Sequence, residues 1–406
     1  MDLQTCSTVA VTRRRVVAGL GAALACGTAL PGAVGASSVT GDALRTKRLI
    51  VLKLDGGNDG LNTLVPCADP LYQRLRPNVG LPRAGLLPLD DELALHPRLV
   101  STMRLFQAGE LAIVQDVGYP RPNLSHFESG AVWEKADPRG KSAAVGWWGQ
   151  VVAHNRTAFD GAALDAAAIT FEQEAAFAAG RRVAVLRARQ DVSEIFAPAA
   201  APPHEGRGRT GAAHVLSELV SDGEAVRARV AHRLRRAPRP AWSPYEQPID
   251  VQVKLTDWFL RHGVLAPVVR LTLGGFDTHS ELVERHGALM GALDGALADL
   301  RARLRATGVW DDTVVLVHSE FGRRPAENGF GGTDHGTSGP VFLLGGRVQG
   351  GIYGARAALD ELDGDGNLLH RTDFRRLYAT LVSGLFQLSA NPFVAQGFEP
   401  LRLRFA

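Results

Sequence analysis

Acidic and histidine residues gather in four glycine-rich segments of this 406-residue chain, and such side chains are the ones that bind divalent metal ions. The glycines beside them let the backbone and a substrate approach closely. The segments are DGGNDGLNT (55–63), GGFDTH (274–279), SEFGRR (319–324) and GTDHGT (332–337), and the candidate metal ligands in them are Asp55, Asp277, His279, Glu320, Asp334 and His335. Mixed nitrogen and oxygen donors suit zinc, manganese or iron better than calcium. The sequence leaves open whether one or two ions bind.

A fifth segment, PNLSHFES (122–129), adds candidate catalytic residues at the start of an expected helix. Ser125 would lie at the helix N-terminus, where backbone N–H groups stabilise an anion, and a metal could activate its hydroxyl as a nucleophile. Ser125 with Glu128 also fits a capping box, and the two roles are compatible. His126, His279, Arg323 and Arg324 could transfer protons or bind an anion.

Each segment also has a structural interpretation. Asp55 could lie in a tight turn, Asp277 could cap the next helix, and Glu320 could pair with Arg323. Asp334 and His335 could belong to an ordinary loop. Four such segments at successive strand ends are nevertheless unlikely to meet at one edge by chance, and this coincidence favours a functional site.

The elements that would position these segments alternate between apolar strands and amphipathic helices. The patterns predict strands over 48–55, 110–117, 266–273, 313–319 and 341–345, and helices over 97–108, 126–135, 248–262, 280–307 and 373–388. Alternation of this kind predicts an α/β fold with a large, mainly parallel sheet between helices. Ligands of such sheets lie at the carboxyl ends of the strands, which is where the polar segments fall.

Two further stretches depart from this pattern. Residues 155–247 are rich in alanine and proline and predict an insertion or cap in the sheet domain. The run Asp363-Gly-Asp365-Gly-Asn367 has acids at the first positions of a calcium loop, but Leu368 stands where that loop requires glycine. A hairpin turn is the preferred interpretation of this run.

The first 36 residues read as an export signal. Arg13, Arg14 and Arg15 precede an apolar run, and Val34-Gly35-Ala36 offers small residues for cleavage. The TRRRVV pattern is typical of a twin-arginine signal, which predicts an exported, periplasmic or extracellular protein with a mature domain over 37–406 and no stable membrane span. Most of the net charge of +3 lies in this signal, so charge gives no case for nucleic-acid binding. Of three cysteines only Cys67 follows it, which excludes an intramolecular disulfide in the mature domain.

The motifs LKLDGGNDGLNTLVP, NLSHFES, GGFDTH, SEFGRRPAENG and GTDHGTSGP, in this order, resemble the bacterial family called domain of unknown function 1501. That family is grouped with the alkaline phosphatase-like superfamily, which includes the sulfatases. The resemblance implies an alkaline phosphatase-like fold with a hydrolytic site of one or two metal ions. It matches Asp55, Asp277, His279, Glu320 and His335 to metal-ligand positions. It also matches Ser125 to the nucleophile.

Two departures from the superfamily pattern bear on function. Asp277 and His279 are two residues apart where the pattern has four, and Phe321 replaces a histidine. We therefore expect an exported hydrolase of phosphate or sulfate esters, with zinc or manganese as cofactor and a small anionic ester as substrate. The alternative is a non-catalytic cell-envelope binding or assembly protein with a degenerate metal site.

Overall fold

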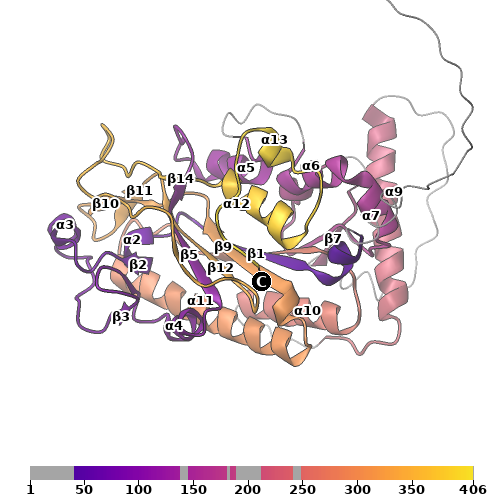
Figure 1. Ribbon diagram of the computed structural model, residues 1–406, viewed down its shortest axis with the longest axis horizontal. Helices are drawn as coiled ribbons and strands as arrows, with labels where there is room; N and C mark the ends of the chain where they lie inside the picture. Colours follow the sequence, from indigo (N-terminus) through magenta and orange to yellow (C-terminus); the bar gives the residue numbers. More distant parts are fainter. Residues whose placement is uncertain (1–40, 138–144, 181–182, 189–211, 241–247, 406) are drawn as a thin grey trace, which may run out of the picture.

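A nine-stranded mixed sheet forms the centre of the computed structural model (Figure 1). The structure describes residues 41–137, 145–180, 183–188, 212–240 and 248–405. The strands run in the order β13-β5-β12-β9-β1-β8-β6-β7, with β14 beside β5. Every pairing is parallel except those of β12 with β5 and β9. The predicted α/β class with a mainly parallel sheet between helices is confirmed.

Four strands end at the edge where the candidate residues lie. They are β1 (Arg48–Asp55), β5 (Leu111–Gly118), β8 (Val268–Gly274) and β9 (Thr313–Ser319). In β1, Ile50 and Leu52 contact one hydrophobic core while Leu49 and Val51 contact another, so the strand is buried on both faces. This burial explains the nearly continuous apolar run in its sequence.

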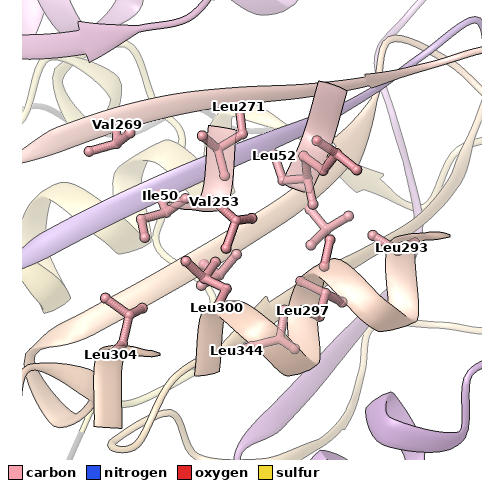
Figure 2. Packing of buried hydrophobic residues seen from close by; sticks show 14 of the residues in the cluster. Ile50, Leu52, Val253, Val269, Leu271, Leu293, Leu297, Leu300, Leu304 and Leu344 are labelled. Atoms are coloured by element: carbon pink, nitrogen blue, oxygen red, sulfur yellow. The ribbon is translucent and has the colours of Figure 1, made fainter. Parts of the chain in front are cut away.

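Helices cover both faces of the sheet (Figure 1). One face packs against α4 (Val100–Gln107), α10 (Pro248–Arg261) and α11 (Leu282–Ala306). In α11 the residues Leu293, Leu297, Leu300 and Leu304 recur at helical spacing and meet Ile50, Leu52 and Leu344 of the sheet (Figure 2). The other face packs against α5 (His126–Lys135), α6 (Trp147–His154), α12 (Arg375–Thr380) with the π-helical turn η3 (Leu381–Leu385), and α13 (Pro392–Ala395).

The remaining elements are short or lie at the edges. In the main sheet they are β6 (Ala168–Thr170), β7 (Val185–Arg187), β12 (Gly339–Leu344), β13 (Gly351–Tyr353) and β14 (Thr372–Asp373). A small sheet contains β2 (Leu64–Val65), β3 (Leu87–Pro88) and β4 (Ala94–Leu95), and a ribbon contains β10 (Arg323–Glu327) and β11 (Thr333–His335). The other helices are α2 (Gly60–Thr63), α3 (Pro70–Leu75), α7 (Arg156–Gly161), η1 (Ala176–Ala178), α9 (Ala212–Leu234) and η2 (Trp310–Asp312).

The expected elements are present, and their ends differ from the predicted ones by at most three residues. The stretch 155–247, predicted as an insertion or cap, contributes β6 and β7 to the sheet edge beside β8. The predicted hairpin turn near Asp363 is present, because Leu362 and Leu368 form an antiparallel bridge around it. The export signal predicted over 1–36 lies outside the described residues. Among the described residues, no helix combines the length and the apolar character needed to cross a membrane.

Candidate metal centre

The candidate site lies at the carboxyl ends of β1, β8 and β9, where the β10–β11 ribbon and the start of α5 meet. The chain after β1 turns sharply at Gly56, whose φ of +119° favours glycine. A Cβ atom there would lie 2.5 Å from the backbone nitrogen of Asp277. The glycine therefore lets the loops after β1 and β8 pack directly against each other.

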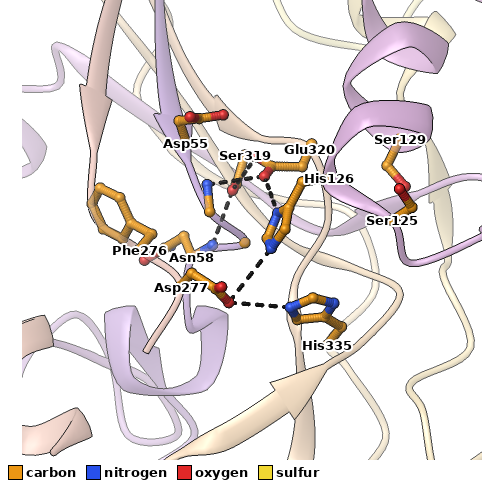
Figure 3. Close-up of polar contacts among 12 residues, drawn as sticks. Asp55, Asn58, Ser125, His126, Ser129, Phe276, Asp277, Ser319, Glu320 and His335 are labelled. Atoms are coloured by element: carbon orange, nitrogen blue, oxygen red, sulfur yellow. Dashed lines mark hydrogen bonds and ion pairs between the residues drawn. The ribbon is translucent and has the colours of Figure 1, made fainter. Parts of the chain in front are cut away.

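Three histidines present their Nε2 atoms to one carboxylate oxygen, Oδ1 of Asp277. Nε2 of His279 lies 3.0 Å from it, Nε2 of His335 lies 3.1 Å from it, and Nε2 of His126 lies 3.4 Å from it. Figure 3 shows His126 and His335 pointing at Asp277 from two different elements. The ligand atoms of His126, Asp277 and His335 all lie within 4.8 Å of one another, which is a spacing that could hold a metal ion.

The opposite ring nitrogen of each histidine meets an acceptor. Nδ1 of His126 lies 2.7 Å from Oε1 of Glu320, and Nδ1 of His335 lies 2.8 Å from the carbonyl oxygen of Leu124. Nδ1 of His279 lies 3.4 Å from Oδ1 of Asp334. An Nδ1–H that donates to such an acceptor leaves the Nε2 lone pair free, which is the usual arrangement of metal-ligating histidines.

This arrangement leaves unpaired acceptors close together. Nε2 of His279 and Nε2 of His335 are 3.0 Å apart, and both lie beside the Asp277 carboxylate. Nε2 of His126 is shielded from solvent and makes no hydrogen bond. Lone pairs that face one another need a proton or a cation between them, so the donor set fits a divalent transition metal.

Glu320 lies behind His126 and is completely buried. Its Oε1 accepts from the Gly56 backbone N–H at 2.9 Å as well as from His126, and its backbone oxygen accepts from Nε1 of Trp133. Glu320 is thus an orienting partner of His126 rather than a member of the group around Asp277. Asp334 has the corresponding place behind His279.

Arg323 holds the loops of the site from inside the protein. Its guanidinium donates to the carbonyl oxygens of Gly57 at 2.7 Å and Thr333 at 2.8 Å, and also to those of Gly56 and Phe276. It also pairs with Oδ1 of Asp277 at 2.7 Å. The side chain is fully buried and pairs with Asp277 rather than with Glu320, and its predicted catalytic role stays a prediction.

The charges around Asp277 favour its ionised form. Burial alone would raise its pKa, but the hydrogen bond from Arg323, the contact with His335 and the charges of Arg323 and His279 hold the pKa well below its usual range. Burial lowers the pKa of His335 in spite of its bonds to Asp277 and Leu124. A carboxylate and a neutral imidazole are the protonation states that bind metal ions.

Two predicted residues lie apart from this group. Asp55 pairs with Nζ of Lys53 at 2.5 Å, and Figure 3 shows it away from Asp277. Ser125 is the residue before α5, but its hydroxyl makes no capping bond, so the predicted capping box with Glu128 does not form. In Figure 3 Ser125 lies beside Ser129, separate from the histidines.

The sequence did not single out Asn328, which supports the site from the β10–β11 loop. Its side chain donates to the carbonyl oxygen of His279 at 3.0 Å and to Oδ1 of Asp334 at 3.1 Å. Its Oδ1 accepts from the backbone N–H groups of Phe330 and Gly332. The Asn-Gly pair at 328–329 was a signal for this turn, since asparagine side chains bond to backbone two residues onward.

Part of the chain resembles a known protein family. A family model described as "Protein of unknown function (DUF1501)" matches residues 259–385. The matched segment contains Asp277, His279, Glu320 and His335. It begins after Asp55 and His126 and so does not include them. No curated protein matched the chain.

Several solved structures are similar at 11% identity. Ps i-CgsB in complex with k-i-k-neocarrahexaose has a TM-score of 0.42 and covers 88% of this chain and 75% of its own. The C-terminal periplasmic domain of EcEptC from Escherichia coli, in complex with Zn, has a TM-score of 0.36 and covers 74% and 73%. PsFucS1 sulfatase from Pseudoalteromonas sp. has a TM-score of 0.35 and covers 90% and 77%. At these scores the likeness concerns the general fold, and function has to be argued from the site.

Proposed function

We propose that the chain is a metal-dependent hydrolase of phosphate or sulfate esters. We infer that one divalent ion, zinc or manganese, binds to Asp277, His126, His279 and His335. The observation that carries this proposal is the convergence of three Nε2 atoms on Oδ1 of Asp277, at 3.0 to 3.4 Å. Each opposite ring nitrogen is held by an acceptor, so the three rings are oriented before any ligand binds.

The start of α5 supports an anionic substrate. His126 is the first residue of this ten-residue helix, and Ser125 leaves the first-turn N–H groups without a side-chain cap. Free N–H groups at a helix N-terminus attract phosphate or sulfate oxygens. The anion would therefore lie between the helix start and the histidine cluster.

A bound divalent ion would supply Lewis acidity and activate a water molecule at neutral pH. Asp277 would stay ionised through its pairing with Arg323, and the Nδ1 contacts of the three imidazoles would leave their Nε2 atoms available to the ion. Ser125 lies apart from the cluster, so the proposal makes water the attacking group and expects a Ser125→Ala variant to retain turnover.

The test is elemental analysis of the protein purified without chelators, followed by assays on a panel of phosphate and sulfate esters. We expect about one equivalent of metal, with Asp277→Asn and His335→Ala losing both the metal and turnover. Asp55→Asn is the matched control and should keep both, because Asp55 pairs with Lys53. Two results together would instead favour the non-catalytic binding or assembly protein: no metal in the purified protein, and no stabilisation against unfolding by added Zn²⁺.

Export and location belong to the same proposal. The signal predicted over 1–36 would deliver the folded protein through the twin-arginine machinery to the periplasm or the exterior. Substitution of Arg13, Arg14 and Arg15 by lysine should leave the protein in the cytoplasm in a fractionation experiment. Unchanged export would refute this route.

A further inference from the structure

A run of basic residues ends α9 and continues past it. Residues 227–239, RARVAHRLRRAPR, contain six arginines and one histidine but no aspartate or glutamate. The buried face of α9 consists of Val226, Val230 and Leu234, which recur every four residues and belong to the hydrophobic core. Because these apolar side chains face inward, the solvent side of this end of the helix is basic.

Four arginines and one histidine of this run line a cleft of about 700 Å³. They are Arg229, His232, Arg233, Arg235 and Arg236, and all five are exposed. The first three follow helical spacings of three and four residues and therefore share one face of α9. Among the described residues that line the cleft, Asp165 supplies the only carboxylate.

Asp165 holds two of the arginines in place at the floor of the cleft. Nε of Arg233 lies 2.8 Å from its Oδ2, and that oxygen also accepts from the Leu265 backbone N–H at 2.8 Å. Arg229 donates to the backbone carbonyl oxygen of Asp165 through Nε at 3.2 Å and Nη2 at 3.1 Å. Two guanidinium groups are thus oriented before any ligand binds, which lowers the entropy that binding costs.

The positive charge of the cleft is only partly balanced. Asp165 neutralises Arg233, whereas Arg229 meets an uncharged carbonyl oxygen. Arg235 lies against the ring of His232, 3.3 Å from both ring nitrogens. In the part of the chain that the structure describes, no carboxylate forms an ion pair with Arg229, Arg235 or Arg236. Three uncompensated guanidinium groups around one cleft favour a ligand with several anionic groups.

The lining of the cleft distinguishes between kinds of anionic partner. A membrane-binding helix presents large apolar side chains to the lipid, and single-stranded nucleic acids stack on aromatic side chains. The exposed large apolar residues of the described chain all lie outside 227–239, and they are Val100, Phe127, Val283, Phe330 and Leu369. Carboxylates need neither feature, because the planar guanidinium fork binds them in a bidentate manner.

We infer that this cleft binds an acidic peptide segment of a partner protein, one that carries at least three carboxylates. Arg229, Arg235 and Arg236 would each receive one of them. In Figure 1, α9 lies at the opposite end of the long axis from β10 and β11, which border the candidate metal centre. The surface is therefore independent of the ester hydrolysis proposed above.

The probe is fluorescein-labelled hexa-L-glutamate, and its binding to the full-length protein is measured by fluorescence anisotropy. Hexa-L-glutamine is the neutral probe of the same length. Hexagalacturonate, a thymidine hexanucleotide and phosphatidylglycerol vesicles represent the other kinds of anionic partner. We expect saturable 1:1 binding of hexaglutamate, with every other probe at least about tenfold weaker. Because the contacts are ionic, binding should weaken markedly as NaCl rises from about 50 to about 200 mM.

Charge reversal of two exposed arginines tests the location of the site. The double variant Arg235→Glu/Arg236→Glu should raise the Kd for hexaglutamate at least about tenfold. Arg83→Glu/Arg104→Glu is the matched control, since both arginines are exposed, lie outside the cleft and change the net charge equally. It should bind within about twofold of the wild type. His335→Ala should also bind hexaglutamate normally, which separates this site from the metal centre.

A third variant keeps the test decisive if the double variant does not fold. Arg236 lies beyond the end of α9 and is exposed, so Arg236→Gln removes one charge without a change in the core. It should weaken hexaglutamate binding measurably with the fold intact by circular dichroism. Three results would each overturn the inference: no saturable binding to the wild type, another probe bound as tightly as hexaglutamate, or equal effects of the two charge-reversal variants.

Discussion

Glu320 offers the sharpest test of how the candidate metal centre is organised. Its Oε1 accepts from both Nδ1 of His126 and the Gly56 backbone N–H, while its Oε2 lies 3.2 Å from Oγ of Ser319. A glutamine could keep all three contacts, because its carbonyl can replace Oε1 and its amide can donate to the Ser319 oxygen. Glu320→Gln therefore removes the negative charge with little change in geometry. Glu320→Ala removes the orienting contacts as well.

The two Glu320 variants should differ in how much zinc affinity they lose, because only Glu320→Ala removes the orienting contacts. Loss of a hydrogen-bonding partner behind a metal ligand costs roughly 10- to 100-fold in affinity. We expect Glu320→Gln at the lower end, about 1.4 kcal/mol in binding free energy. We expect Glu320→Ala at the upper end, about 2.7 kcal/mol, because the His126 ring also loses its orientation.

The assay is a zinc titration in competition with a chromophoric chelator, with circular dichroism and thermal unfolding to verify the fold of each variant. Asp55→Asn serves as the control and should bind zinc within about twofold of the wild type, since Asp55 does not belong to the group around Asp277. Wild-type affinity in both Glu320 variants would refute the idea that Glu320 orients a ligand. Weakened binding in Asp55→Asn alone would place the ion elsewhere.

Three further predictions concern stability, each measured by urea unfolding. Arg323→Lys should lower the free energy of unfolding by about 3 kcal/mol, because lysine cannot donate to all the buried carbonyl oxygens that Arg323 bonds. A decrease below about 1 kcal/mol would contradict the described hydrogen-bond network. Leu300→Ala should cost about 2–5 kcal/mol, whereas Phe127→Ala, at a side chain 91% exposed, should stay within about 0.5 kcal/mol. Burial lowers the pKa of His318 to about 3, so this neutral imidazole takes up a proton on unfolding below its ordinary value of 6.5. His318 alone should therefore lower the unfolding free energy of the metal-free protein as the pH falls from 6.5 towards 3, by about 2 kcal/mol at pH 5. His318→Gln should show a smaller decrease, and an identical pH profile would contradict this origin.

The fold class and the main strands could be predicted from the sequence for a simple reason. Strands buried on both faces need continuous apolar runs, and β1 and β9 carry such runs with few interruptions. Periodicity likewise predicted α5 and α11, since one face of each helix packs against the sheet. The short strands β6, β7, β10 and β11 escaped prediction, because three to five residues carry too little periodicity.

The candidate site divides in the same way. The sequence by itself determined which loops carry the acids and histidines, since these follow the ends of parallel strands that share one edge. The sequence could not determine which of these side chains point into the site, because side-chain rotamers and the packing of the loops set the direction of each side chain. The tertiary structure alone placed His126 among the ligand candidates, moved Glu320 behind it and left Asp55 with Lys53. The physical reason is that a metal site depends on distances of about 3 Å between residues up to two hundred positions apart, and only the packed fold sets those distances.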